Sequence, residues 1–266
     1  MSQTWNSEFI AQLHLSPMQD MQELFSLADL ADWPNADGLN VLKDMGLARD
    51  RPIPRFVCQN ALPPAATYYE QIIFQQGIIP TRAQSWHDLF NGLMWLQFPR
   101  TKTLLNQLHV TDIEQFGLSP RTHRRNNLTH FDECGVVLAC SDPALLELLK
   151  NHQWHEIFVE HRARWGRDIY PYIFGHANYE SLLKPFIGLT GKWLAVEVEK
   201  DFGEQCLGEQ SEKIDSLLVA KIAQEDTFAE PRPLLPLPLL GIPGWWNANQ
   251  DDKFYSNTDY FRPKRS

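Results

Sequence analysis

Several features that mark common enzyme and membrane-protein classes are scarce in this sequence. The four cysteines (Cys58, Cys134, Cys140 and Cys206) form no CxxC pair, so they indicate reduced thiols and not a cysteine-based zinc site. No apolar stretch reaches the roughly 18 to 20 residues that a membrane-spanning helix requires, and the start "MSQTWNSEFIAQ" has no signal-peptide pattern. These absences predict a cytoplasmic protein with no membrane segment.

Positive charge is also scarce. Lysine and arginine together number 24 against 33 acidic residues, which gives a formal net charge of -9. Binding to nucleic acid or to an anionic membrane requires a net or clustered positive surface. The composition therefore disfavours nucleic acid as a partner, and only the basic segment "RTHRRNN" keeps that alternative open.

The short motifs that identify nucleotide-binding and hydrolytic enzymes are missing as well. The chain has no Rossmann or P-loop glycine pattern, no GxSxG elbow and no HExxH zinc motif. Bulky residues, in contrast, are plentiful: of the 266 residues 43% are hydrophobic, and nine are tryptophan, fifteen phenylalanine and eighteen proline. This composition predicts a sizeable core of aromatic rings with many irregular connections.

Hydrophobic periodicity and capping signals indicate more helix than strand. The predicted helices include one after Ser16-Pro17, one from Ser85, and others over residues 100–117, 143–166 with a break near His152, and 209–225. Short strands are predicted at residues 56–58, 136–140 and 169–177, while residues 192–199 suit either a strand or a helix. Regular βαβ alternation is absent, so we predict a mostly helical α+β fold, a single domain with a few short strands.

The two ends of the chain differ from its centre. Residues 1–49 are predicted to form an N-terminal helical segment packed on a main domain of residues 50–266. From residue 231 prolines recur every few positions, which excludes a regular helix. Such a tail is either a disordered ligand for another protein or a strap across the core. Its many Leu, Trp, Phe and Tyr residues favour an irregular C-terminal strap over residues 231–266.

The stretch "TRAQSWHDLFNGLMWLQFPRTK", residues 81–102, places polar side chains on an apolar helix. Ser85 and Asp88 suit a helix start, with Asp88 as a capping carboxylate. His87 and Asn91 are four residues apart and therefore share one face of the helix. Because two polar side chains in apolar surroundings must both find partners, His87 and Asn91 are candidates for catalysis.

A second cluster is "RTHRRNNLTHFDECG", which precedes the predicted strand at residues 136–140. A solvated basic loop that ends in a turn explains Arg121, Arg124 and Arg125 without any function. Alternatively, these arginines bind an anionic substrate, with Asp132 or Glu133 partly buried beside them as metal ligand or as acid and base.

A third candidate is His176 in "FGHA", which follows Gly175 at the end of an apolar run. Glycine lets the backbone approach a neighbour closely, so His176 is expected at the rim of a pocket, although Gly175 equally suits a simple turn. Imidazole and carboxylate groups together are the ligands of hard or borderline divalent metals. We therefore predict Asp132 and His176 as metal ligands and His87, Asn91 and Glu133 as catalytic residues. Their convergence depends on the fold.

Two functions of different classes follow from these candidates. The first is a metal-assisted hydrolase acting on an anionic or phosphorylated small molecule, with a divalent metal as cofactor. The alternative is a non-catalytic binding protein that uses a groove lined by the Trp and Tyr residues near positions 86, 95, 245, 246, 255 and 260. Simple core packing also explains Trp86 and Trp95.

Several uncommon blocks recur in a fixed order: "TRAQSWHDLFNGLMWLQFPRTK", "FDECG", "FGHA", "LPLLGIPGWW" and "FYSNTDYFRP". Through these blocks the chain resembles a mainly proteobacterial family known as domain of unknown function 3025, over roughly residues 50–263. The resemblance implies that most of the chain is one unit that includes the proline-rich tail. It implies no catalytic assignment, so the site residues above rest on their own chemistry.

Overall fold

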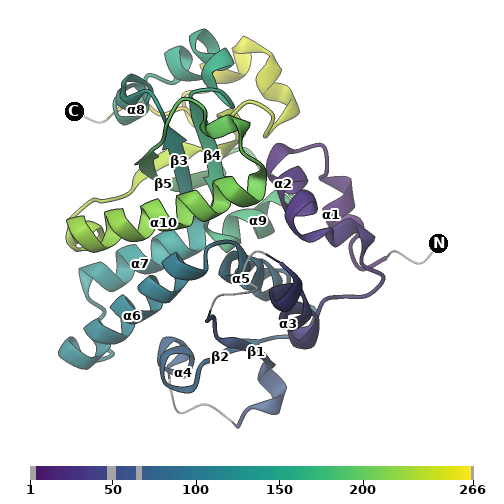
Figure 1. Ribbon diagram of the computed structural model, residues 1–266. Coiled ribbons are helices and arrows are strands. Elements are labelled where there is room, and N and C mark those ends of the chain that lie inside the picture. Colours follow the sequence, from purple (N-terminus) through teal and green to yellow (C-terminus); the bar gives the residue numbers. More distant parts are fainter. Residues whose placement is uncertain (1–3, 47–51, 64–67, 265–266) are drawn as a thin grey trace.

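The computed structural model describes residues 4–46, 52–63 and 68–264 (Figure 1). The α-helices in these ranges are α1 Ser7–Ala11, α2 Ser16–Phe25, α3 Ala36–Met45, α4 Tyr69–Gln76, α5 Trp86–Gln97, α6 Pro99–Phe116, α7 His123–Cys134, α8 Pro143–Lys150, α9 His176–Leu182 and α10 Leu207–Glu225. The strands are β1 Arg55–Cys58, β2 Ile78–Thr81, β3 Gly135–Cys140, β4 Ile169–Ile173, β5 Thr190–Glu197 and β6 Leu235–Pro238. The predicted α+β, mostly helical fold is confirmed.

A four-stranded sheet with the order β4-β3-β5-β6 lies at the centre of the fold. Every residue of β3 is buried, and β3 pairs antiparallel with β4 and parallel with β5. The sequence "GVVLAC" is apolar throughout, as expected for a strand inside a sheet whose two faces are both covered. In Figure 1 the long helix α10 runs across the sheet, and α7 and α6 follow beside it. A smaller parallel pair, β1 and β2, lies apart from this sheet.

The C-terminal segment is an irregular strap, as predicted. Its strand β6 pairs with β5 at the edge of the sheet, which is where a strand containing prolines is tolerated. Further along, the Tyr260 hydroxyl donates to the Leu189 carbonyl (2.6 Å) and accepts from the Leu240 N–H (2.9 Å). Tyr255, Tyr260 and Phe261 are buried. The aromatic residues of the tail therefore belong to the core.

Aromatic rings connect the N-terminal helices to the rest of the chain. The ring centroids of Trp5 and Trp33 lie 5.7 and 4.9 Å from that of Trp86, at the start of α5. The Ser16 N–H donates to the Gly244 carbonyl of the C-terminal segment (3.0 Å). The predicted boundary between residues 49 and 50 lies in 47–51, outside the described residues, so that division of the chain stays a prediction.

Some local interpretations of the sequence need correction. The basic segment before β3 is not a solvated loop: it forms helix α7, which Thr122 caps by accepting from the Arg125 N–H (3.1 Å). Residues 192–199, left open between strand and helix, contribute strand β5. In the part of the chain that the structure describes, no helix combines the length and the apolar character that crossing a membrane requires.

Candidate metal centre

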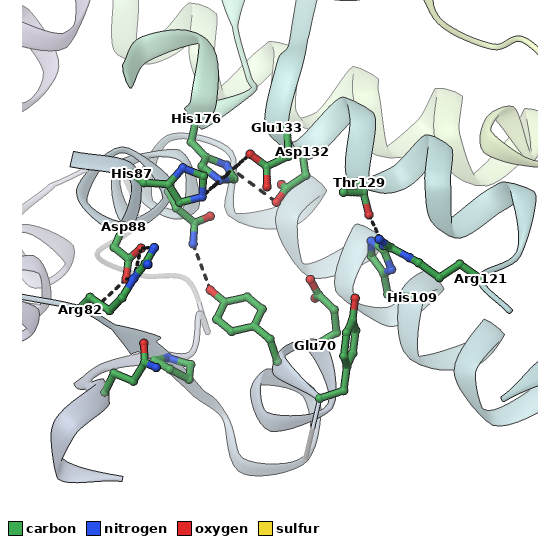
Figure 2. Close-up of a pocket in the computed structure, with 15 residues that line it drawn as sticks. Glu70, Arg82, His87, Asp88, His109, Arg121, Thr129, Asp132, Glu133 and His176 are labelled. Carbon is green, nitrogen blue, oxygen red and sulfur yellow. Dashed lines mark hydrogen bonds and ion pairs between the residues drawn. The ribbon is translucent and has the colours of Figure 1, made fainter. Parts of the chain in front are cut away.

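A polar pocket with a volume of about 410 Å³ lies where α4, α5, α7 and α9 meet (Figure 2). Six of the eight site residues predicted from the sequence line it: His87, Asn91, Arg121, Asp132, Glu133 and His176. His87 and Asn91 come from the first turns of α5, Asp132 and Glu133 from the last turn of α7, and His176 from the start of α9. The tertiary structure thus brings together residues that the sequence separates by up to 89 positions.

The close approach of two backbone turns positions His176 beside Glu133. The N–H groups of Phe174 and Gly175 both donate to the Gly135 carbonyl, at 3.0 and 2.9 Å. A Cβ atom at Gly175 would lie 2.5 Å from Cys134 N and closer still to Gly135 N and Glu133 O. Only glycine permits this contact. Of the two roles that the sequence suggested for Gly175, a close backbone contact or a simple turn, the structure therefore supports the close contact.

Three ligand atoms from three helices converge at one point. His176 Nε2 lies 3.0 Å from His87 Nε2 and 3.4 Å from Glu133 Oε2, and the distance from His87 Nε2 to Glu133 Oε2 is 3.9 Å. A circle through atoms at these separations has a radius of about 2.0 Å, and zinc binds nitrogen and carboxylate oxygen at about 2.0 to 2.2 Å. The three side chains can therefore bind one small divalent cation.

Glu180 fixes the orientation of the His87 ring. Its Oε2 lies 3.0 Å from His87 Nδ1, so this nitrogen carries the hydrogen and Nε2 presents a lone pair toward His176 and Glu133. A carboxylate behind a histidine is the usual support of a metal-binding imidazole. Burial lowers the pKa of His176 to about 3, so this ring is neutral at physiological pH, as a metal ligand must be.

Asp132, predicted as a metal ligand, is engaged with a lysine. Its carboxylate is hydrogen-bonded to Lys102 Nζ, and its Oδ2 lies 3.9 Å from His176 Nδ1. Burial would raise the pKa of Asp132, but the charge and the hydrogen bond of Lys102, together with the nearby His176 and His109, outweigh burial and lower the pKa. The convergent carboxylate is that of Glu133, for which the sequence suggested a catalytic role. Asp132 thus lies near the His176 nitrogen that is not one of the three converging atoms.

The three predicted substrate-binding arginines have different surroundings. Arg121 lines the pocket and donates to Thr129 (Figure 2). Arg124 is paired with the buried Asp112 (Nε to Oδ1, 2.9 Å). Arg125 is fully buried, where it donates to the carbonyls of Gly117 (3.3 Å) and Leu118 (2.9 Å). Of the three, Arg121 is the one placed to contact a ligand in the pocket.

Asp88 also differs from its predicted role as a capping carboxylate. The cap of α5 is Ser85, whose hydroxyl accepts from the Asp88 N–H (3.3 Å). The Asp88 carboxylate accepts from the main-chain N–H of Arg82 and pairs with its guanidinium, both at 2.6 Å. This pairing holds Arg82 at the pocket, a position that no motif in the sequence indicates (Figure 2).

Sequence reasoning missed Glu70, His109 and Glu180. Glu70 and His109 line the pocket, and burial lowers the pKa of His109 to about 4, so its ring is uncharged. Of these three, only Glu180 has a sequence signal, since it follows His176 at the i, i+4 spacing of one helix face. In the structure, however, its partner is His87 from another helix.

The aromatic residues proposed to line a groove are mostly in the core. Trp95, Trp245, Tyr255 and Tyr260 are each at most 7% exposed. Trp86 is partly buried and stacks on Phe90 with a centroid distance of 5.4 Å. This placement leaves little aromatic surface for a partner and favours the packing interpretation of these rings.

Glu70 gives the pocket a pH-dependent effect on stability. Burial and the nearby Asp132 raise its pKa from 4.5 to about 7. The folded protein therefore binds more protons than the unfolded chain between these values, so this group lowers stability as the pH rises from 4.5 to about 7. We expect Glu70→Gln to be more stable than the wild type at pH 8 by about 1 to 2 kcal/mol, and this difference should fall to about a quarter of that value at pH 5. Urea unfolding at both pH values measures this, and an equal difference at the two would contradict it.

The family described as "Protein of unknown function (DUF3025)" matches residues 54–265. The chain belongs to this family. The predicted resemblance is confirmed, and the DUF3025 segment contains every residue that lines the pocket and the C-terminal strap up to residue 265. Searches among curated proteins and among solved structures found no match.

Proposed function

We propose that the protein is a metal-dependent hydrolase whose divalent metal is held by His87, Glu133 and His176. The observation that carries the proposal is the convergence of the three ligand atoms, at 3.0, 3.4 and 3.9 Å from one another, on the wall of a pocket. Without a metal the same atoms form at best a histidine–histidine hydrogen bond beside a carboxylate. Two histidines and one carboxylate are also a common ligand set of catalytic zinc sites.

The arrangement leaves room for the chemistry of a hydrolase. Catalytic zinc sites use three protein ligands and keep a further position for water, whose pKa the metal lowers to about 7. Here the ligand set borders a pocket of about 410 Å³, which supports access for water and a small substrate. Nitrogen and oxygen donors suit zinc, manganese and iron alike, so the ligand types favour no single one of these metals.

The charges around the pocket support an anionic or phosphorylated small molecule as the substrate. The carboxylates of Asp88 and Asp132 are paired with Arg82 and Lys102. Glu133 would be neutralised by the metal, and the raised pKa of Glu70, about 7, keeps much of it protonated at neutral pH.

Arg82 and Arg121 each have five N–H donors, more than their contacts with Asp88 and Thr129 use. They are the groups available for a substrate anion.

Metal uptake and metal-dependent hydrolysis test the proposal together. We expect metal-free protein to bind one Zn²⁺ or Mn²⁺ per chain in a calorimetric titration. The loaded protein should hydrolyse p-nitrophenyl phosphate or p-nitrophenyl acetate at least about tenfold faster than the metal-free protein. Absence of metal uptake would sink the proposal. If the protein binds the metal but hydrolyses neither compound, only the metal site of the proposal remains and the hydrolase activity is refuted.

Glu180 provides a graded test of the same site. Glu180→Gln keeps the shape of the side chain but replaces the carboxylate that holds His87 Nδ1 at 3.0 Å. We expect the affinity for Zn²⁺ to fall by about 10- to 100-fold, the usual effect of losing the group behind a metal-binding histidine. Glu160→Gln, at an exposed position outside the pocket, is a control that should bind Zn²⁺ as the wild type does. Unchanged affinity in Glu180→Gln would mean that the carboxylate does not support the ligand.

We also propose that the protein resides in the cytoplasm. The support is that all four cysteines are free, although Cys58 and Cys206 are exposed. Exposed free thiols persist in reducing compartments. Recovery of the protein mainly in a periplasmic or extracellular fraction would contradict this placement.

A further inference from the structure

One wall of the pocket contains a chain of three hydrogen-bonded side chains, Lys102, Asn91 and Tyr69. The Lys102 side chain is only 4% exposed, and its ammonium donates to Asp132 and to Asn91 Oδ1, the latter at 2.9 Å. Asn91 Nδ2 in turn donates to the Tyr69 hydroxyl at 3.0 Å. Tyr69 is 37% exposed and lines the pocket. The chain therefore runs from a buried charge to a group that a ligand can reach.

The direction of each hydrogen bond follows from the lysine. An ammonium group only donates, so Lys102 must face the amide oxygen of Asn91. The amide nitrogen, which also only donates, then faces Tyr69. The Tyr69 oxygen is thereby an acceptor toward Asn91, and its own hydrogen must point away from that residue. Such a preoriented donor does not have to break an existing bond to Asn91 when a ligand binds.

We propose that the Tyr69 hydroxyl donates a hydrogen bond to an oxygen atom of the pocket's ligand, with Asn91 and Lys102 as its positioning residues. The inference rests on the proposed hydrolase and narrows its substrates to compounds whose reacting group carries an acceptor oxygen, that is, a carbonyl or a phosphoryl group. Asn91 lies one turn after His87 on the same face of α5, so the donor and a metal ligand are supported by one helix face. A fixed donor stabilises the charge that such an oxygen gains during hydrolysis.

The test uses inorganic phosphate as the probe and the full-length protein loaded with Zn²⁺. We expect Tyr69→Phe to bind phosphate at least about tenfold more weakly than the wild type, because a hydrogen bond to a charged group is lost. Its Zn²⁺ affinity should stay within about twofold, since Tyr69 is not a ligand. The matched control is Tyr170→Phe, which removes a tyrosine hydroxyl outside the pocket, on β4, where it donates to the Arg167 carbonyl at 2.6 Å. It should bind phosphate as the wild type does.

Asn91→Ala tests the positioning separately, because it keeps the Tyr69 hydroxyl and removes the amide that orients it. We expect an intermediate loss of phosphate affinity, about threefold. Equal phosphate affinity of the wild type and Tyr69→Phe, an equal loss in Tyr170→Phe, or no phosphate binding by the wild type would each overturn the inference. A failure of the proposed hydrolase is visible independently, as absence of Zn²⁺ uptake by the wild type. In that case, phosphate titration of the metal-free wild type and Tyr69→Phe tests the hydrogen bond from Tyr69 without the metal.

Discussion

His176→Ala is expected to lower the affinity of the protein for Zn²⁺ by more than about 100-fold. This loss exceeds that expected for a residue such as Glu180, which only supports a metal ligand. The substitution removes one of three converging ligand atoms and leaves His87 and Glu133 unable to enclose a cation. Calorimetric titration of the metal-free variant measures the loss. Any metal-dependent hydrolysis should disappear with it, because the activated water depends on the metal.

Two further variants separate loss of the ligand from loss of the fold. His176 is 3% exposed, so its replacement also leaves a space in the protein, whereas the Glu133 side chain is 36% exposed. Glu133→Gln should fold like the wild type and still bind Zn²⁺ more weakly by over about tenfold, because a neutral amide replaces an anionic ligand. His130→Ala, at an exposed position on the same helix as Glu133, is the matched control and should leave Zn²⁺ binding unchanged. Retained binding in both His176→Ala and Glu133→Gln would rule out this metal centre.

Gly175→Ala is expected to have the second large effect, on the free energy of unfolding. The added methyl group would meet main-chain atoms of Glu133, Cys134 and Gly135 at 2.5 Å or less. Main-chain atoms cannot rotate aside as a flexible side chain can, so the two turns must separate. We expect the free energy of unfolding to fall by about 3 kcal/mol, the upper part of the range for overpacking, as measured by urea denaturation.

The same substitution should also weaken Zn²⁺ binding, because it moves His176 away from Glu133. Gly38→Ala is the matched control: it lies in α3, outside the pocket, and the nearest atom to its new methyl group would be 3.3 Å away. This control should change stability by less than about 1 kcal/mol. If Gly175→Ala retains full stability and full metal affinity, the close contact of the two turns does not position the site.

Local chemistry made several parts of this protein predictable from the sequence. Ser85 before an apolar periodic run predicts the start of α5, and the structure has Ser85 as its cap. The run "VVLAC" has no polar residue to place on an exposed face, and it forms the central strand β3. His87 and Asn91 share a face of α5 because of helix geometry alone, and both line the pocket.

The neighbouring residues Asp132 and Glu133 show where such reasoning ends. The side chains of consecutive helix residues point about 100° apart, so two adjacent carboxylates cannot both point directly at the same partner. The orientation of α7 directs Glu133 to the histidines and Asp132 to Lys102. The residues of "FDECG" alone do not indicate which of the two carboxylates contacts the histidines. Arg124 and Arg125 illustrate the same limit, since their partners lie in other segments of the chain.

By itself, the sequence determined the fold class, the family, the core strand, the strap and the types of side chain available for chemistry. Periodicity, capping and composition act over a few residues, and these features depend on them. Only the tertiary structure decided that His87, Glu133 and His176 meet at one point, that Glu180 holds His87, and that Lys102 takes Asp132. These contacts join helices far apart in the chain, and their geometry depends on how the whole core packs.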